Sequence, residues 1–324
     1  MEQISKADPV AAADFSLDFP FALEAPRQRA DFRRLLEDFQ VVEDLGFQPS
    51  GEGEHLYIRI RKRNENTRWI AGLLARHFAV DEHAVGYCGL KDRRALTTQW
   101  FSVQLPGKSD FPIPQLPGCE ILATGRHGKK LRPGMHKGNQ FSIVLRFDGD
   151  VENEVEQRLA ALKAQGAPNY FGEQRFGIDA NNLREVAAIV ARKHPRFQGK
   201  RGGLYLSAAR SWLFNIVLAD RVRSGSWRAV ASGPLWGRGR SSAEATLAAE
   251  EASILQPWQS WCLALEHSGL RQERRPLVLA PENFQWQWLD GCLTLDFGLP
   301  PGTYATALLR EVAQLRTCAE PGAE

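Results

Sequence analysis

Short stretches in which apolar and polar residues alternate lie in the first half of the chain and again near its end. Alternation with a period of two predicts β-strands that bury one face. The early stretches are DFQVVEDL (38–45), HLYIRIRK (55–62), HAVGYCGL (83–90), LTTQWFSVQL (96–105) and QFSIVLRF (140–147). The late ones are NFQWQWLD (283–290) and CLTLDF (292–297).

Helical spacing occupies the intervals between these strands. NENTRWIAGLLARHF (64–78) begins with a cap at Asn66 or Thr67, and VENEVEQRLAALKAQG (151–166) is amphipathic and stops at Gly166. Further helices are predicted over 180–193, 206–224, 242–254 and 303–315. Strands, then helices, then strands predict an α+β fold in which a helical segment is inserted into a sheet-based domain.

The composition is typical of a globular protein, and we expect a cytoplasmic one. The chain has 324 residues, 43% of them hydrophobic. Its N-terminus lacks the basic start and apolar core of a signal peptide, and no uncharged apolar run approaches the roughly 18 residues of a membrane span. Five cysteines are scattered without a CxxC pair, which indicates neither a zinc knuckle nor a disulfide frame. We therefore expect a reduced protein with no metal and no membrane association.

Charge is segregated along the chain, although the net charge is only +3. The stretches 125–139, 191–210 and 221–240 contain many Lys and Arg and no acid, whereas acids collect in 148–157. Such runs are either ordinary solvated faces or a surface for a polyanion, because cations neutralise phosphates and release counterions. The segregation favours a nucleic-acid partner without excluding the solvated face.

GLKDRRALTTQ (89–99) sets one acid, Asp92, among basic residues between two predicted strands. An Asp at a turn often only bonds local amides. The neighbouring cations, among them the adjacent Lys91, also favour the ionised form of the Asp92 carboxylate, which is the form that a nucleophile or base needs. Both interpretations remain open on local grounds. Phosphate-loop, dinucleotide and metalloprotease patterns are incomplete or absent, so no cofactor is expected.

Several long motifs resemble the TruD-type pseudouridine synthases. GLKDRRALTTQ is similar to the catalytic stretch of that family, and EDFQVVED (37–44) to its N-terminal strands. The other similar segments, in the family's order, are LRPGMHKGNQF (131–141), APNYFGEQRFG (167–177), LSAARSWLFN (206–215) and LPPGTYATALLRE (299–311). The similarity is weakest over about 216–275.

The resemblance implies isomerisation of uridine to pseudouridine in tRNA, at position 13 in bacterial members, without a cofactor. It also implies a catalytic domain around a mixed, mainly antiparallel sheet, interrupted by a mostly helical TRUD domain. The expected boundaries are 1–165 with 277–324 for the catalytic domain, and 166–276 for the insertion, with about 1–20 disordered or loosely packed. We expect a monomer.

The resemblance gives Asp92 the role of catalytic carboxylate; whether it attacks C1′, attacks the base or removes a sugar proton stays open. It also implies a uracil pocket. The pocket residues are Phe39, Asn139, Phe141 and Tyr304. From the residues alone, the aromatics would be core and Asn139 a turn residue.

Basic residues are assigned to the carboxylate and to RNA. Arg33 stands near the place where family members commonly carry a lysine, so Arg33 or Lys91 is the candidate partner of Asp92. The candidate contacts to the RNA backbone are Lys129, Lys130, Arg132, Lys137, Lys200 and Arg201. The alternative function is a non-catalytic RNA-binding or RNA-folding protein on the same scaffold.

Overall fold

The structure is a computed structural model that describes residues 15–107, 112–199 and 201–317. The chain divides into two compact units, each described by itself. The sheet unit comprises Arg27–Leu159, Pro281–Ala305 and Ala313–Glu324. The helical unit comprises Met1–Pro26, Ala160–Ala280 and Thr306–Val312. The domain boundaries expected from the sequence, at 166 and 276, remain a prediction.

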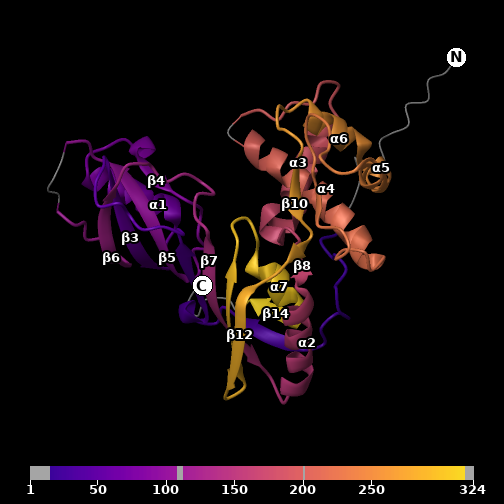
Figure 1. The fold of residues 1–324 in the computed structure, drawn as a ribbon, viewed down its shortest axis with the longest axis horizontal. Coiled ribbons are helices and arrows are strands. Elements are labelled where there is room, and N and C mark those ends of the chain that lie inside the picture. Colours follow the sequence, from indigo (N-terminus) through magenta and orange to yellow (C-terminus); the bar gives the residue numbers. More distant parts are fainter. Residues whose placement is uncertain (1–14, 108–111, 200, 318–324) are drawn as a thin grey trace. The chain divides into compact units, whose positions relative to one another are not determined.

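The sheet unit is built on a 10-stranded sheet in which β12, β13, β7, β2, β5, β3 and β6 are hydrogen-bonded neighbours in that order (Figure 1). These strands are β2 (Phe39–Asp44), β3 (His55–Arg63), β5 (Leu96–Gln104), β6 (Cys119–His127), β7 (Gly138–Phe147), β12 (Glu282–Leu289) and β13 (Cys292–Leu299). Off this path lie β1 (Arg29–Phe32), β4 (Val85–Tyr87) and β14 (Gln314–Thr317). Strands β2 and β5 pair in parallel, as do β1 and β14, and the other pairs are antiparallel. The mixed, mainly antiparallel sheet is confirmed.

Helix α1 (Thr67–His77) covers one face of the strands β3 and β5. Its cap is Asn66, whose side chain accepts a hydrogen bond from the Arg68 amide. The helix buries Ile70 and Leu74 in one cluster with Ile58 of β3. Burying such side chains contributes about 1.5–3 kcal/mol each, so this cluster fixes the strands that flank the Asp92 loop.

The helical unit is organised around α4 (Gly202–Arg223), whose Trp212 is buried against other aromatic rings. Phe15 and Phe19 are buried on Trp212, with ring centroids 5.4 and 5.6 Å away. Residues 1–14, most of the segment predicted to be loosely packed, lie outside the described residues. The other helices are α3 (Asn181–Val190), α5 (Ala245–Ile254) and α6 (Gln259–Glu266); most of α7 (Ala305–Val312) also belongs here, and α2 (Glu152–Gln165) crosses the boundary.

Two small antiparallel pairs complete the helical unit. They are β8 (Ala167–Pro168) with β11 (Val278–Leu279), and β9 (Ser232–Leu235) with β10 (Glu273–Pro276). Pattern analysis predicts neither pair, nor α6, nor strand β6. The α+β fold with a mostly helical insertion is nevertheless confirmed. Among the described residues, no helix is both long and apolar enough to span a membrane.

Candidate active site

Asp92 lies in the loop between β4 and β5, and polar side chains from neighbouring elements hold this loop. The Lys91 amide donates to Thr67 Oγ1 at 3.0 Å, and that hydroxyl donates to Gln99 Oε1 at 2.8 Å. Gln99 Nε2 in turn donates to the Gly89 carbonyl at 3.3 Å. Thr67 and Gln99 are both buried, so the start of α1 and strand β5 fix the loop from inside.

Arg33 is the residue that contacts the Asp92 carboxylate. Its Nη2 lies 2.9 Å from Asp92 Oδ2, and its side chain is 12% exposed against 39% for Asp92. Burial lowers the pKa of the Arg33 guanidinium, and the ion pair with Asp92 opposes that shift. The guanidinium also stacks over the ring of Phe39, 4.0 Å from its centroid. Arg33 adopts φ = 58°, a left-handed conformation that is costly for a residue with a Cβ.

Lys91, the other candidate partner of Asp92, pairs with a different acid. Its Nζ lies 2.8 Å from Glu43 Oε2, with side chains 6% and 0% exposed. Glu43 Oε1 also accepts a hydrogen bond from the Trp100 amide at 3.0 Å. A buried ion pair needs further hydrogen bonds to offset its desolvation, and the Trp100 amide supplies one here. The pair fastens the Asp92 loop to the end of β2.

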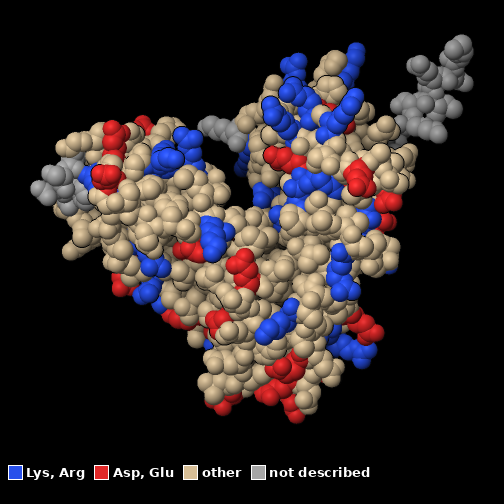
Figure 2. Space-filling view, in the orientation of Figure 1, with Lys and Arg blue, Asp and Glu red and all other residues tan. Residues whose placement is uncertain are grey.

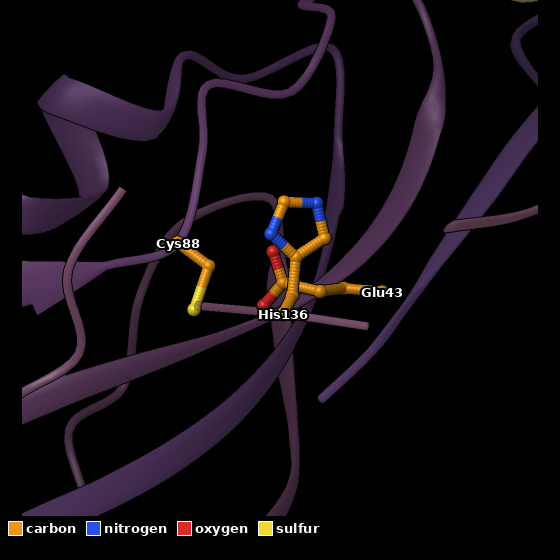
Figure 3. A group of neighbouring side chains, drawn as sticks. All are labelled: Glu43, Cys88 and His136. Atoms are coloured by element: carbon orange, nitrogen blue, oxygen red, sulfur yellow. The ribbon is translucent and has the colours of Figure 1, made fainter. Parts of the chain in front are cut away.

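Glu43, Cys88 and His136 form a buried group whose ligand-type atoms lie within 4.8 Å of one another (Figure 3). Carboxylate, thiol and imidazole are all zinc ligands. Here, however, Lys91 already neutralises Glu43. Burial raises the pKa of Cys88 to about 12, and burial together with Lys91 lowers the pKa of His136. The group is a neutral thiol and a neutral imidazole beside a buried ion pair, and we assign no metal to it.

Aromatic residues of β2, β7 and β13 form a row across the sheet. Phe141 of β7 is half-buried and stacks on Phe297 of β13, with centroids 5.3 Å apart and an angle of 17°. Phe39 of β2 meets Phe141 edge to face at 6.1 Å and is 2% exposed. Phe141 therefore has the accessible position of a stacking residue, whereas Phe39 supports the row from beneath Arg33.

Asn139, the second residue of β7, lies opposite Glu43 of β2 and Leu299 of β13. Its Nδ2 lies 3.4 Å from His136 Nε2. Its Oδ1 is buried and has no hydrogen-bond partner among the residues that the structure describes. A buried amide oxygen without a partner is unusual in a folded protein, and it leaves Asn139 with an acceptor to offer to a ligand.

The remaining predicted residues are more dispersed. Tyr304 is half-buried in the segment between β13 and α7. Lys129, Arg132, Lys137 and Arg201 are exposed, whereas Lys130 Nζ donates to the His83 carbonyl. Lys200 lies outside the described residues. In the sheet unit, acidic side chains gather around the start of α2 and the β12–β13 turn (Figure 2).

Sequence reasoning did not select four residues that contact the site. They are Lys62, Glu43, His136 and Phe297. Glu43, Lys62 and Phe297 lie in predicted strands, where the alternation pattern reports only which face a residue occupies. The one available signal is that Glu43 and Lys62 are charged residues inside strands that otherwise read as half-buried.

Comparisons with known proteins show which family the chain is similar to. The family model described as tRNA pseudouridine synthase D (TruD) matches residues 19–198, more than half of the chain. A curated relative from Cellvibrio japonicus, named tRNA pseudouridine synthase D, is 48% identical over 318 residues, which cover 94% of this chain and 95% of that protein. A relative of the same name from Aeromonas hydrophila is 42% identical over 327 residues, covering 90% and 92%.

A solved structure supports the fold. A crystal structure from Methanosarcina mazei, assigned to tRNA pseudouridine synthase D (TruD), superposes with a TM-score of 0.66 at 20% identity and covers 90% of this chain and 95% of that one. The chain belongs to the tRNA pseudouridine synthase D (TruD) family.

Proposed function

We propose that the chain isomerises uridine to pseudouridine in tRNA, at uridine 13, with Asp92 as the catalytic carboxylate. Members of this family are isomerases, and this chain is a tRNA pseudouridine synthase by that membership. The observation that carries the role of Asp92 is its environment. The half-exposed Asp92 carboxylate lies in the loop that resembles the family's motif. It forms an ion pair with Arg33, whose backbone is in a left-handed conformation.

The reaction defines what the site must supply. The C1′–N1 bond breaks, the uracil turns and C5 bonds to C1′; the C5 proton then leaves to solvent and N1 takes up a proton, so that atoms and electrons balance. A positioned carboxylate starts this sequence by attack on C1′, by attack on the base or by removal of a sugar proton. Arg33 fixes Asp92 Oδ2, and the exposed part of the carboxylate faces the substrate.

The target base must leave its stack and be held in a pocket. Phe141, supported by Phe297, offers it a stacking face, and Asn139 offers an amide to the edge of the uracil. Phe39 acts indirectly, because it carries the guanidinium of Arg33 on its ring. Tyr304 closes the same pocket from the segment before α7. These roles follow the family motifs and the contacts of Phe141 and Asn139.

The acid-free basic stretches 125–139, 191–210 and 221–240 bind the tRNA through its phosphates. Lys129, Arg132, Lys137 and Arg201 are exposed and suited to this contact. In the helical unit, Lys and Arg side chains gather in Figure 2 around the places where Figure 1 labels α3 and α6. A monomeric state and a cytoplasmic location remain predictions from the sequence.

The deciding experiment replaces Asp92 by Asn, which keeps the shape of the side chain and removes its charge. We expect release of tritium from C5-labelled uridine in transcribed tRNA to fall below detection, while tRNA binding persists. Arg93→Gln, a change at the exposed neighbouring residue, is the matched control and should stay active. Activity of Asp92→Asn within about tenfold of wild type would remove Asp92 from this role.

The same assay separates the two candidate functions, because tritium release requires turnover and binding alone does not produce it. A wild-type protein that binds tRNA but releases no tritium would support the non-catalytic RNA-binding alternative. Replacement of uridine 13 in the transcript tests the position: release from labelled uridines should disappear with that one nucleotide. Unchanged release would place the reaction elsewhere in the tRNA.

A further inference from the structure

Lys62, near the end of β3 in the sheet unit, is a lysine whose side chain is fully buried, at 0% exposure. It belongs to β3, where it pairs with Thr97 of β5 on one side and Cys119 of β6 on the other. Lysine is almost never buried completely unless it is paired. A buried ammonium in a strand that is paired on both sides therefore needs an explanation that strand formation does not give.

The contacts of Lys62 lead to the catalytic loop. Its Nζ donates to the main-chain carbonyl of Asp92 at 3.1 Å and to that of Glu65 at 2.6 Å. Neither partner is a carboxylate oxygen, so the ammonium is not neutralised by direct contact. The hydrogen bond joins the rigid strand to the one residue of the loop that is assigned to the chemistry.

We propose that Lys62 is a positioning residue, which holds the Asp92 main chain with a buried positive charge and so fixes the catalytic carboxylate for turnover. The inference rests on the proposed role of Asp92. Arg33 contacts the side chain of Asp92 from one side, and Lys62 contacts its main chain from the strand below. Catalytic geometry is sensitive to displacements of about 1 Å, which can cost about 100-fold in rate.

The charge on Lys62 is expected to matter as well as its hydrogen bonds. Burial lowers the pKa of Lys62 to about 8, so the ammonium loses its proton at mildly alkaline pH. The titratable groups around it are Asp92, Glu65, Cys119 and Lys91. Burial raises the pKa of Cys119 to about 11, so that thiol titrates well above Lys62.

The test compares two uncharged variants whose unbranched side chains are one heavy atom shorter than that of lysine. Lys62→Met removes the donors and the charge, whereas Lys62→Gln removes the charge and keeps an N–H donor. Arg61→Met is the matched control, since Arg61 is the preceding residue of β3 and its exposed side chain pairs with Glu120. Single-turnover rates and tRNA affinity are measured with the full chain between about pH 6.5 and 9.5.

We expect the wild-type rate to fall as pH rises through about 8, where Lys62 loses its charge. Lys62→Met should be slower than wild type by about 10- to 100-fold at neutral pH, with little change in tRNA affinity. Lys62→Gln should be intermediate, and both variants should lose the alkaline fall. Arg61→Met should keep both the wild-type rate and its decrease at alkaline pH. Titration of the uracil ring is common to all variants and cancels in their ratios.

Three results would overturn the proposal. They are an alkaline fall in Lys62→Gln equal to that of wild type, rates within about twofold of wild type in both variants, or failure of both variants to fold. The last would make Lys62 a structural residue. Asp92→Asn is run in parallel: if it turns over, the proposed function fails, whereas if it is inactive and the Lys62 variants behave as wild type, only this inference fails.

Discussion

Single residues around Asp92 show which roles a motif can predict. The motif predicted Asp92 as the catalytic carboxylate; the family resemblance gave Arg33, and the adjacent position gave Lys91, as its candidate basic partners. In the structure, Arg33 contacts Asp92 and Lys91 contacts the buried Glu43. No local pattern could separate these outcomes, because Arg33 reaches Asp92 only through a left-handed backbone and the packing of β2 beneath it. Long-range contacts of this kind are set by the tertiary fold.

Phe141 gives a prediction that separates chemistry from binding. Phe141→Ala removes a stacking face worth about 1–3 kcal/mol per base, so turnover should fall by about 5- to 150-fold. Affinity for tRNA should change much less, because the phosphate contacts remain. The comparison is kcat against the Kd from filter binding, with Phe141→Tyr as the conservative control. Equal losses in kcat and affinity, or no loss in either, would make Phe141 a core residue.

Lys62 gives a prediction about stability and pH that does not depend on activity. Its folded pKa is about 8 against an ordinary value of 10.5, so between these values the unfolded chain binds a proton that the folded chain lacks. The free energy of unfolding must then rise with pH through this window. Two and a half pKa units correspond to about 3 kcal/mol at most.

The measurement is urea unfolding of wild type and Lys62→Gln at neutral pH and near pH 10. We expect the difference in unfolding free energy to shift in favour of the wild type at the higher pH, because the cost of the buried charge disappears there. Arg61→Met should show the wild-type shift. A constant difference between wild type and Lys62→Gln would mean that the lysine keeps an ordinary pKa in the folded protein.

At the scale of elements, the sequence predicted the strands with clear alternation and the helices with clear caps. Strands β2, β3, β5, β7, β12 and β13 lie where period two indicates them. Strand β6 was not predicted; it pairs with β3, and its last residues lie in the basic stretch 125–139. Strands β1 and β14 pair in parallel between distant parts of the chain. Their existence depends on a partner and not on local propensity.

The start of β7 offers a prediction at this scale. A Cβ on Gly138 would lie 2.7 Å from the Leu299 carbonyl oxygen, a distance that real Cβ atoms do not tolerate. Gly138→Ala should therefore push β7 from β13 and move Asn139, the next residue. We expect a loss of about 1–3 kcal/mol in stability and a larger proportional loss of turnover. Gly128→Ala, where nothing lies within 4 Å, is the control. Wild-type kinetics for Gly138→Ala would contradict this account of the strand.

At the scale of the whole molecule, the order of strands and helices was sufficient to predict an α+β fold with a helical insertion. The motifs were sufficient to predict the family, to which the chain belongs. Charge segregation predicted a polyanionic partner but not which basic groups meet it. Lys130 shows why, because its ammonium bonds a main-chain carbonyl although it lies within an acid-free run. A run of charges in the sequence does not distinguish solvated from bonded side chains.

Binding of tRNA through phosphates predicts a steep dependence on salt, with a slope set by the number of phosphates neutralised. Replacement of the exposed residues Lys129, Arg132 and Lys137 by Gln should lower this slope by up to about one unit for each phosphate that is no longer neutralised. Turnover at saturating tRNA should be nearly unchanged, because none of the three is assigned to the chemistry. The matched control replaces Arg68 and Arg76, which are exposed on α1 outside the acid-free stretches. If the triple variant keeps the wild-type slope, or if the control lowers it equally, the stretch 125–139 is an ordinary solvated surface and the tRNA is held elsewhere.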